Sequence, residues 1–270
     1  MADIIKVKNL TKKFKSLVAV DSISFQVKKG EIFGFLGPNG AGKSTTIRML
    51  TTLTRPTSGS AEVAGYDIVK QPDEVRSHIG LVAEKIILYD HLTPSENLQF
   101  FGRLNGLTVE EINKRADKWL KRLKMEEWKN LQVGTFSTGM KQRINIARAL
   151  LTEPDILFLD EPTLGLDPQT TYMIKTFITE LNKQGVTIIL TTHDMYEAEA
   201  LSDRVAIIDH GKIVALGTVE ELKKKVKNKK SPTLEDVFLE KTGFEVRDKI
   251  GKMAAMHRGP HRITQNNRVR

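Results

Sequence analysis

A glycine-rich loop at residues 37–44 constrains the fold more than any other feature of this sequence. It reads Gly-Pro-Asn-Gly-Ala-Gly-Lys-Ser and lies between a short apolar run at 32–36 and a helical pattern at 44–51. A strand, a glycine-rich turn and a helix in this order present backbone N–H groups and the positive end of a helix dipole to an anion. The loop therefore predicts a phosphate-binding site at the end of a strand.

The residue types in this loop match the parts of a nucleoside triphosphate. Lys43 places a cation on the β- and γ-phosphates, the Ser44 hydroxyl is a ligand for Mg²⁺, and Thr45 adds a hydroxyl near the α-phosphate. The candidate binding residues are Gly37, Pro38, Asn39, Gly40, Ala41, Gly42, Lys43, Ser44 and Thr45. A guanine site would need Asn-Lys-x-Asp after a strand, and the nearest string, at 182–185, ends in glycine. Guanine nucleotides are therefore disfavoured.

Short apolar runs alternate with helical patterns over most of the chain. The runs predict strands at 32–36, 156–159, 186–191 and 204–209. The helical patterns that join the last three lie at 169–184 and 195–202. Strands that are apolar nearly throughout are typical of a parallel sheet covered on both faces. The predicted fold class is therefore α/β.

Other patterns flank this core. Two amphipathic strands are expected before it, at 4–10 and 20–27, and a hairpin partner follows it at 212–216. Residues 85–150 are rich in helix formers and predict a helical region. Near the end, Ser231 and Pro232 predict an N-cap and first helical position for a helix at 233–241.

Two carboxylates, Asp160 and Glu161, follow directly on the apolar run 156–159. Ligands of parallel sheets bind at the carboxyl ends of the strands. Asp160 is expected to hold Mg²⁺, directly or through water, and Glu161 to polarise the attacking water as general base. The alternative is that the two acids cap the next helix. His193 ends another run at the same edge, and we expect it to contact the γ-phosphate, although a lone histidine is more often structural.

Composition and charge limit the class of protein. The 270 residues include no cysteine, which excludes disulfides and thiolate metal sites. No apolar run approaches the roughly 20 residues needed to span a bilayer, so a soluble intracellular chain is expected. The net charge of +9 lies in segments 223–230 and 244–270, because residues 1–222 are balanced. A nucleic-acid-binding protein usually carries a basic stripe on its folded surface, so no nucleic acid is expected as partner. The lysine run at 223–230 is interpreted as a solvated helix face or linker, with attraction to an anionic membrane surface as the next alternative.

A second candidate anion-binding helix start lies 24 residues before Asp160, where residues 136–143 read Phe-Ser-Thr-Gly-Met-Lys-Gln-Arg. Because the chain already has one phosphate-binding loop, this second helix start suggests action on a nucleotide held elsewhere. At this point the chain resembles the nucleotide-binding subunit of an ABC transporter. The resemblance covers residues 4 to about 240 and keeps the family's motifs in order.

The resemblance implies a P-loop NTPase fold. A RecA-like parallel sheet core would carry an N-terminal antiparallel β subdomain and an α-helical subdomain inserted at about 85–150. The ATPase domain would span 1–243, with its C-terminal helices at about 218–243. Residues 244–270 would form a basic, flexible tail.

The resemblance also assigns roles to residues of this chain. Walker A would be 37–45, Walker B 156–161, and the D-loop Leu166-Asp167. Phe14 would stack on adenine and His193 would be the switch histidine, with Lys43 and Glu161 completing the catalytic set. The remaining nucleotide contacts would come from Glu84, Ser137, Thr138, Gly139 and Asp167. The implied cofactors are ATP and Mg²⁺, with Ser44, Glu84 and Asp160 as metal ligands.

The family implies two partners. Two copies of the chain would form a head-to-tail homodimer that holds ATP between Walker A of one copy and Ser137–Gly139 of the other. Closure on ATP and reopening after hydrolysis would drive a separately encoded membrane permease, at the cytoplasmic face of the membrane. The strings at 163–167 and 231–238 resemble the daunorubicin-resistance-type branch, which exports drugs, lipids or polysaccharides. Alternatives are a soluble ABC ATPase without a membrane partner and an ATP-gated regulatory module.

The chain departs from the family pattern at two positions. Thr138 stands where the signature usually has glycine, and it adds a Cβ at a place of close backbone approach. Glu84 stands where the Q-loop usually has glutamine, and it brings a negative charge towards the γ-phosphate. The apolar string 86–89 that follows Glu84 is either buried or part of a groove for the permease.

Overall fold

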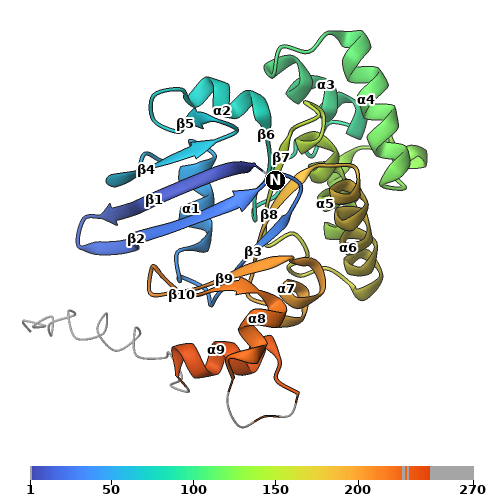
Figure 1. The fold of residues 1–270 in the computed structure, drawn as a ribbon. Coiled ribbons are helices and arrows are strands. Elements are labelled where there is room, and N and C mark those ends of the chain that lie inside the picture. Colours follow the sequence, from blue (N-terminus) through green and yellow to red (C-terminus); the bar gives the residue numbers. More distant parts are fainter. Residues whose placement is uncertain (1, 227–228, 230, 244–270) are drawn as a thin grey trace, which may run out of the picture.

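The computed structural model describes residues 2–226, 229 and 231–243, which form two sheets with helices around them (Figure 1). The predicted tail at 244–270 and parts of the lysine run lie outside the described residues. The antiparallel sheet has the strand order β2-β1-β4-β5, and the second sheet has the order β10-β9-β3-β8-β7-β6. The predicted combination of a parallel core and an N-terminal antiparallel sheet is confirmed.

The antiparallel sheet consists of β1 (Asp3–Phe14), β2 (Leu17–Lys28), β4 (Ser58–Val63) and β5 (Tyr66–Asp67). β1 and β2 are longer than the sequence patterns suggested, because they form a tight hairpin in which Phe14 pairs with Leu17. β4 carries serines and a glycine and was not expected from its sequence. It is a strand here because it pairs antiparallel with β1.

The second sheet consists of β3 (Ile32–Leu36), β6 (Ile79–Val82), β7 (Ile156–Asp160), β8 (Thr187–Thr192), β9 (Arg204–Asp209) and β10 (Lys212–Thr218). All neighbours are parallel except β10, which forms a hairpin with β9. Its strands are apolar on both faces. In β7, Phe158 packs in the core shared with the antiparallel sheet, and Leu157 and Leu159 pack in the core on the other side.

The helices cover both faces of the parallel sheet. α1 (Lys43–Leu50) contributes Ile47, Met49 and Leu50 to the core between the two sheets. The remaining helices are α2 (Pro72–His78), α3 (Pro94–Leu104), α4 (Val109–Arg122), α5 (Thr138–Ala149), α6 (Pro168–Lys183), α7 (Met195–Leu201), α8 (Val219–Lys224) and α9 (Leu234–Thr242). In the ranges that the structure describes, no helix combines the length and hydropathy that crossing a bilayer requires.

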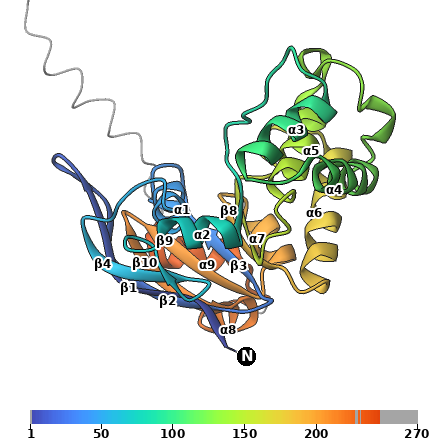
Figure 2. The ribbon, with the colours of Figure 1, turned by 90° about the horizontal axis from the view of Figure 1, so that it is seen from above.

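α3, α4 and α5 gather at one end of the molecule, away from the antiparallel sheet (Figure 2). Capping boxes start α3 at Thr93 and α4 at Thr108, each with a glutamate three residues later. Their apolar faces join α6 and one face of the parallel sheet in a single core, which includes Leu98, Trp119 and Phe177. This arrangement places a helical region where the sequence predicted one.

The last described helix starts differently from its prediction. Ser231 is not its N-cap, and Pro232 is not its first helical residue. α9 begins at Leu234, and Thr233 is the N-cap, with a capping box that involves Asp236. The hydroxyl of Thr233 accepts from the N–H of Asp236, and the Asp236 carboxylate accepts from the N–H of Thr233. This reciprocal pair satisfies two backbone N–H groups at once, so a helix start with Thr233 as N-cap is favoured over one with Ser231 as N-cap and Pro232 as first helical residue.

Candidate nucleotide-binding site

The glycine-rich loop connects β3 to α1 in the predicted way. Gly40 and Gly42 have φ of +79° and +110°. A Cβ on Gly42 would lie 2.5 Å from the backbone oxygen of Ala19 in β2, so only glycine fits this turn. Lys43 is the first residue of α1, and its ammonium folds back over the loop. Its Nζ donates to the carbonyl oxygens of Gly37 at 2.7 Å and Pro38 at 3.3 Å.

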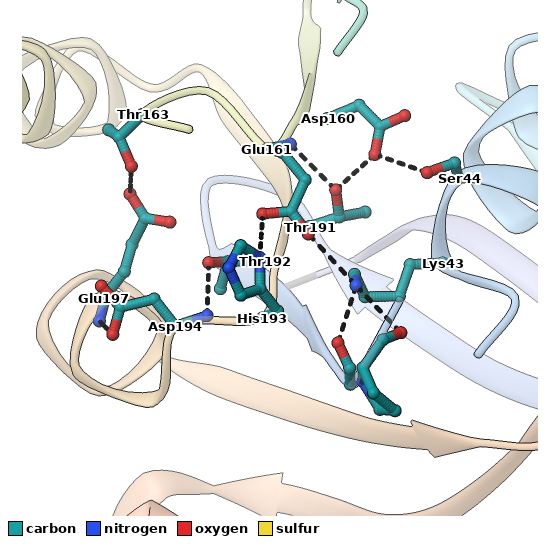
Figure 3. Close-up of polar contacts among 12 residues, drawn as sticks. Lys43, Ser44, Asp160, Glu161, Thr163, Thr191, Thr192, His193, Asp194 and Glu197 are labelled. Atoms are coloured by element: carbon teal, nitrogen blue, oxygen red, sulfur yellow. Dashed lines mark hydrogen bonds and ion pairs between the residues drawn. The ribbon is translucent and has the colours of Figure 1, made fainter. Parts of the chain in front are cut away.

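The Walker B carboxylates end β7, as expected. The Ser44 hydroxyl donates to Asp160 Oδ1 at 3.0 Å, so two of the three predicted metal ligands lie side by side (Figure 3). Thr191 in β8 donates its own hydroxyl to the same oxygen. Asp160 is buried and lies beside the loop. The alternative reading of Asp160 and Glu161 as helix caps is wrong, because Asp167 is the N-cap of α6.

Glu161 lies between Lys43 and His193. Its Oε1 is 3.1 Å from Lys43 Nζ, and its Oε2 is 2.9 Å from His193 Nδ1. The Glu161 carboxylate is buried, whereas the His193 side chain is nearly half exposed. The backbone of Glu161 has a φ of +50°, and its N–H donates to both the carbonyl and the hydroxyl oxygen of Thr191. Glu161, Lys43 and His193 are thus one connected cluster at the carboxyl edge of the sheet.

A cavity of about 710 Å³ opens over this cluster. Its lining includes Phe14, which is 47% exposed, and Glu84, an exposed carboxylate without a hydrogen bond or ion pair to any described residue. The predicted loop residues in the lining are Pro38, Asn39, Gly40, Ala41, Gly42, Lys43, Ser44 and Thr45. An exposed aromatic ring beside a phosphate-binding loop offers a stacking surface for a base.

The signature residues do not line this cavity. Ser137 is the N-cap of α5, where its hydroxyl accepts from the N–H of Met140, and Ser137 and Thr138 are exposed. Gly139 is buried, and a Cβ on it would lie 3.0 Å from Thr170 of α6. The two candidate anion-binding features of the chain are therefore separate, and its own fold does not bring them together.

Asp167 also lies outside the cavity, at the start of α6. The N–H of Thr170 donates to its carboxylate at 2.9 Å, and this hydrogen bond holds the pKa of Asp167 below its usual range. The ionised carboxylate is exposed and close to the partly buried Arg143 on α5.

Several site residues could not be found from the sequence. Thr191 was read only as part of a strand, yet its hydroxyl donates to the Asp160 carboxylate and accepts from the backbone N–H of Glu161. His210 and Gly211, in the turn between β9 and β10, line the cavity, as do Leu17 and Val18 at the tip of the first hairpin. The repeated threonines at the end of β8 are the one signal for Thr191, since polar residues in a fully buried strand need partners.

The residues present fit a magnesium–nucleotide complex. Ser44 and Asp160 supply two adjacent oxygen ligands of the kind that Mg²⁺ prefers. Within residues 2–226, 229 and 231–243, no group of three or more His, Cys, Asp or Glu side chains is placed to hold a metal ion. Ser44 and Asp160 alone therefore match Mg²⁺ that is bound by one or two protein oxygens together with substrate phosphates.

Comparison with known families agrees with the geometry. The family model described as "ABC transporter" matches residues 20–164, a stretch that contains the loop, the signature and the Walker B pair. This chain belongs to the ABC transporter family.

Relatives with assigned names are resistance and transport proteins. The chain is 46% identical to the doxorubicin resistance ATP-binding protein DrrA of Mycobacterium tuberculosis over 77% of its length, and it spans 62% of that relative. It is 45% identical to the linearmycin resistance ATP-binding protein LnrL of Bacillus subtilis over 81% of its length, covering 70% of that protein. These names place the chain beside the daunorubicin-resistance-type branch that the sequence indicated.

Solved structures agree on the fold. An ATP-binding subunit of an ABC transporter superimposes with a TM-score of 0.80 at 30% identity, over 88% of this chain and 99% of that one. A bacterial ABC transporter cassette described as dimeric superimposes with a TM-score of 0.73 at 31% identity, over 79% of this chain and 98% of the other.

Proposed function

We propose that two copies of this chain hold ATP jointly and hydrolyse it to power export through a separate membrane subunit. One observation carries the dimer: Ser137, Thr138 and Gly139 begin a helix outside the cavity that contains Lys43. An exposed helix start with free N–H groups binds phosphate, and here its ligand would be the nucleotide of the other copy. The similarity to a cassette described as dimeric supports this arrangement.

In the proposed site, Phe14 stacks on the base and the glycine-rich loop surrounds the phosphates. Lys43 now donates to Gly37 and Pro38 and pairs with Glu161, so bound phosphate competes with these partners for its ammonium. Mg²⁺ supplies neutralisation of the β- and γ-phosphate charge, and Ser44 and Asp160 would hold it. Glu84 faces the same cavity and is the third proposed ligand.

Proton transfer follows from the position of Glu161. When phosphate takes over Lys43, Oε1 of Glu161 loses its ion pair and is free to accept a proton from a water molecule. His193 stays bonded to Oε2, so it orients the carboxylate. Its half-exposed ring is the group that we assign to the γ-phosphate.

An apolar surface on the helical end suits the membrane partner. The string after Glu84 is only partly buried: Leu88 packs against the core, whereas Ile87 and Tyr89 are 53% and 48% exposed. Tyr89 packs edge-on against Phe100 of α3. Phe100 and Leu104 line a hollow of about 400 Å³, together with the polar residues Glu96, Gln99 and Arg103. Large exposed apolar side chains gathered in this way mark a protein contact, and we assign it to the permease.

The direction and place of transport rest on the relatives. The similarity to proteins named for doxorubicin and linearmycin resistance supports export of a drug-like or lipid-like compound. We place this chain at the cytoplasmic face of the membrane, bound to the permease. The exposed apolar surface argues against a soluble ABC ATPase without a membrane partner. The contact between Glu161 and His193 argues against an ATP-gated regulatory module, since such a module does not require a general base. Nucleic acid is not expected as partner.

Two measurements test the proposal. Sedimentation of Glu161→Gln should show a dimer with ATP and a monomer without it, whereas a monomer under both conditions would contradict the shared site. Purification from membranes should bring down a polytopic subunit encoded beside this chain. The surface variant Phe100→Ser should no longer co-purify with that subunit but should still bind ATP. Recovery of the same amount of subunit with the wild type and with Phe100→Ser would contradict the docking surface.

A further inference from the structure

Residues 162–166 connect Glu161 to Asp167, the N-cap of α6. This segment contains turns but no helix or strand. Its first residues are nevertheless held from two sides. Gln142 of α5, itself buried, donates its side-chain amide to the carbonyl oxygen of Pro162 at 2.8 Å. From the other side, the hydroxyl of Thr163 donates to Oε1 of Glu197 at 2.6 Å (Figure 3).

Glu197 is an unusual residue for this position. It lies in α7, only 1% of it is exposed, and it does not line the cavity. A buried carboxylate is costly unless it is paired or hydrogen-bonded, and a short bond from a hydroxyl to a carboxylate is among the stronger hydrogen bonds. α7 begins two residues after His193, so Glu197 belongs to the same short unit as the proposed switch histidine.

The segment needs such support because of Glu161. A glutamate at a φ of +50° is strained by roughly 1–3 kcal/mol and keeps this conformation only when its surroundings hold it. On one side its N–H is fixed by Thr191. On the other side the chain continues directly into Pro162 and Thr163, the two residues that Gln142 and Glu197 hold.

We infer that Thr163 and Glu197 are a positioning pair that keeps Glu161 aimed at the lytic water. The inference rests on the proposed role of Glu161 as general base. Neither residue lines the cavity over Lys43. The pair fixes the backbone after Glu161 to the helix after His193, so that the carboxylate stays between Lys43 and His193.

This role predicts a change in turnover without a change in nucleotide binding. Thr163→Val removes the hydroxyl and should lower kcat by about tenfold or more, since a hydrogen bond to a charged group is worth that much. The KM for ATP and the affinity for ADP should stay within about twofold, because the cavity lining is intact. Thr163→Ser keeps the hydroxyl and should restore kcat. Thr176→Val, on the exposed face of α6, is the matched control and should leave all three quantities unchanged.

The double variant Thr163→Val/Glu197→Leu separates positioning from stability. Thr163→Val alone leaves a buried carboxylate without its hydroxyl donor and should lower the melting temperature. Replacing both partners by apolar groups should recover most of that loss, whereas kcat should remain low. A double variant with wild-type kcat would overturn the inference, as would a folded Thr163→Val chain with wild-type kcat. Full activity of Glu161→Gln would instead contradict the proposed role of Glu161 as general base. An inactive Glu161→Gln variant together with a fully active Thr163→Val variant would contradict only the role of the positioning pair.

Discussion

Lys43 and Glu161 form a buried ion pair, with 3.1 Å between Nζ and Oε1 and less than a tenth of either side chain exposed. The pair joins the glycine-rich loop to the proposed general base. In the proposed mechanism, phosphate bound at Lys43 displaces Glu161, so the exchange that binds the nucleotide would also free the base.

This exchange predicts that Glu161→Gln binds ADP more tightly than the wild type. The variant removes a negative charge that competes for Lys43 and repels phosphate, so the Kd for ADP should fall by at least about threefold. Calorimetric titration measures it. The control is His193→Ala, which removes the other partner of Glu161 without releasing Lys43 and should leave the Kd near its wild-type value. Weaker ADP binding by Glu161→Gln would show that the ion pair does not oppose the phosphate.

Glu84 should make nucleotide binding unusually dependent on Mg²⁺. Its exposed carboxylate faces the same cavity as the phosphates, so it repels ATP until a divalent cation is present. In Glu84→Gln, binding of ATP without Mg²⁺ should strengthen by a few-fold, and the Mg²⁺ titration of ATPase activity should shift. Fluorescent-nucleotide binding with and without a chelator provides the first measurement. Glu127→Gln, which changes an exposed glutamate in the helical end, is the control. If ATP affinity without Mg²⁺ and the Mg²⁺ titration are the same in Glu84→Gln and Glu127→Gln, the proposed role of Glu84 is wrong.

Thr191 should matter both for stability and for the metal. Thr191→Val leaves Asp160 and the N–H of Glu161 without a buried hydroxyl partner and should lower the free energy of unfolding by about 1–3 kcal/mol. It should also raise the Mg²⁺ concentration needed for half-maximal ATPase activity. Thr187→Val, at the opposite end of the same strand, loses a hydrogen bond from Gly30 and should affect stability alone. Equal Mg²⁺ dependence in the two variants would argue against a role of Thr191 at the metal.

Acid should loosen the start of α9. Lys229 and the N–H of Thr233 bond the Asp236 carboxylate and lower its pKa to about 2. Because the folded-state pKa lies below the unfolded value of 3.8, the stabilisation is complete above that value and is lost as the pH falls towards 2. Carboxyl titration by NMR should find this low pKa, and Asp236→Asn should remove the acid-induced exchange of α9 amides. An Asp236 that titrates near 3.8 would contradict the capping geometry. Glu235→Gln is the neighbouring control.

The sequence predicted what local pattern encodes. The apolar runs of β3, β7 and β8 and the spacing of the glycine-rich loop each depend on a few neighbouring residues, and the structure has them where they were expected. Glu161 and His193 were expected at one edge because parallel strands end together, and they are in contact. The strand β4 was missed because its serines and glycine carry no strand signal, and only pairing with β1 makes it a strand.

Contacts between distant segments were beyond the sequence. Thr191 and Thr163 are ordinary threonines until the fold places them against Asp160 and Glu197. The exposure of Ile87 and Tyr89 could not be told from burial either, since an apolar string has the same pattern in a core and in a binding surface. The assignments of Glu84, Ser137, Thr138 and Asp167 to a nucleotide remain predictions.

The most direct test of the shared site is a mixture of two inactive chains. Lys43→Ala disables the loop, and Ser137→Arg blocks the signature helix, so each variant alone should hydrolyse almost no ATP. In an equal mixture, half of the dimers contain one of each, and one of their two sites combines an intact loop with an intact signature. The account predicts that the mixture recovers about one quarter of the wild-type rate if the two sites work independently. A mixture as inactive as its components, in chains shown to exchange partners, would contradict the claim that two copies complete each other's sites.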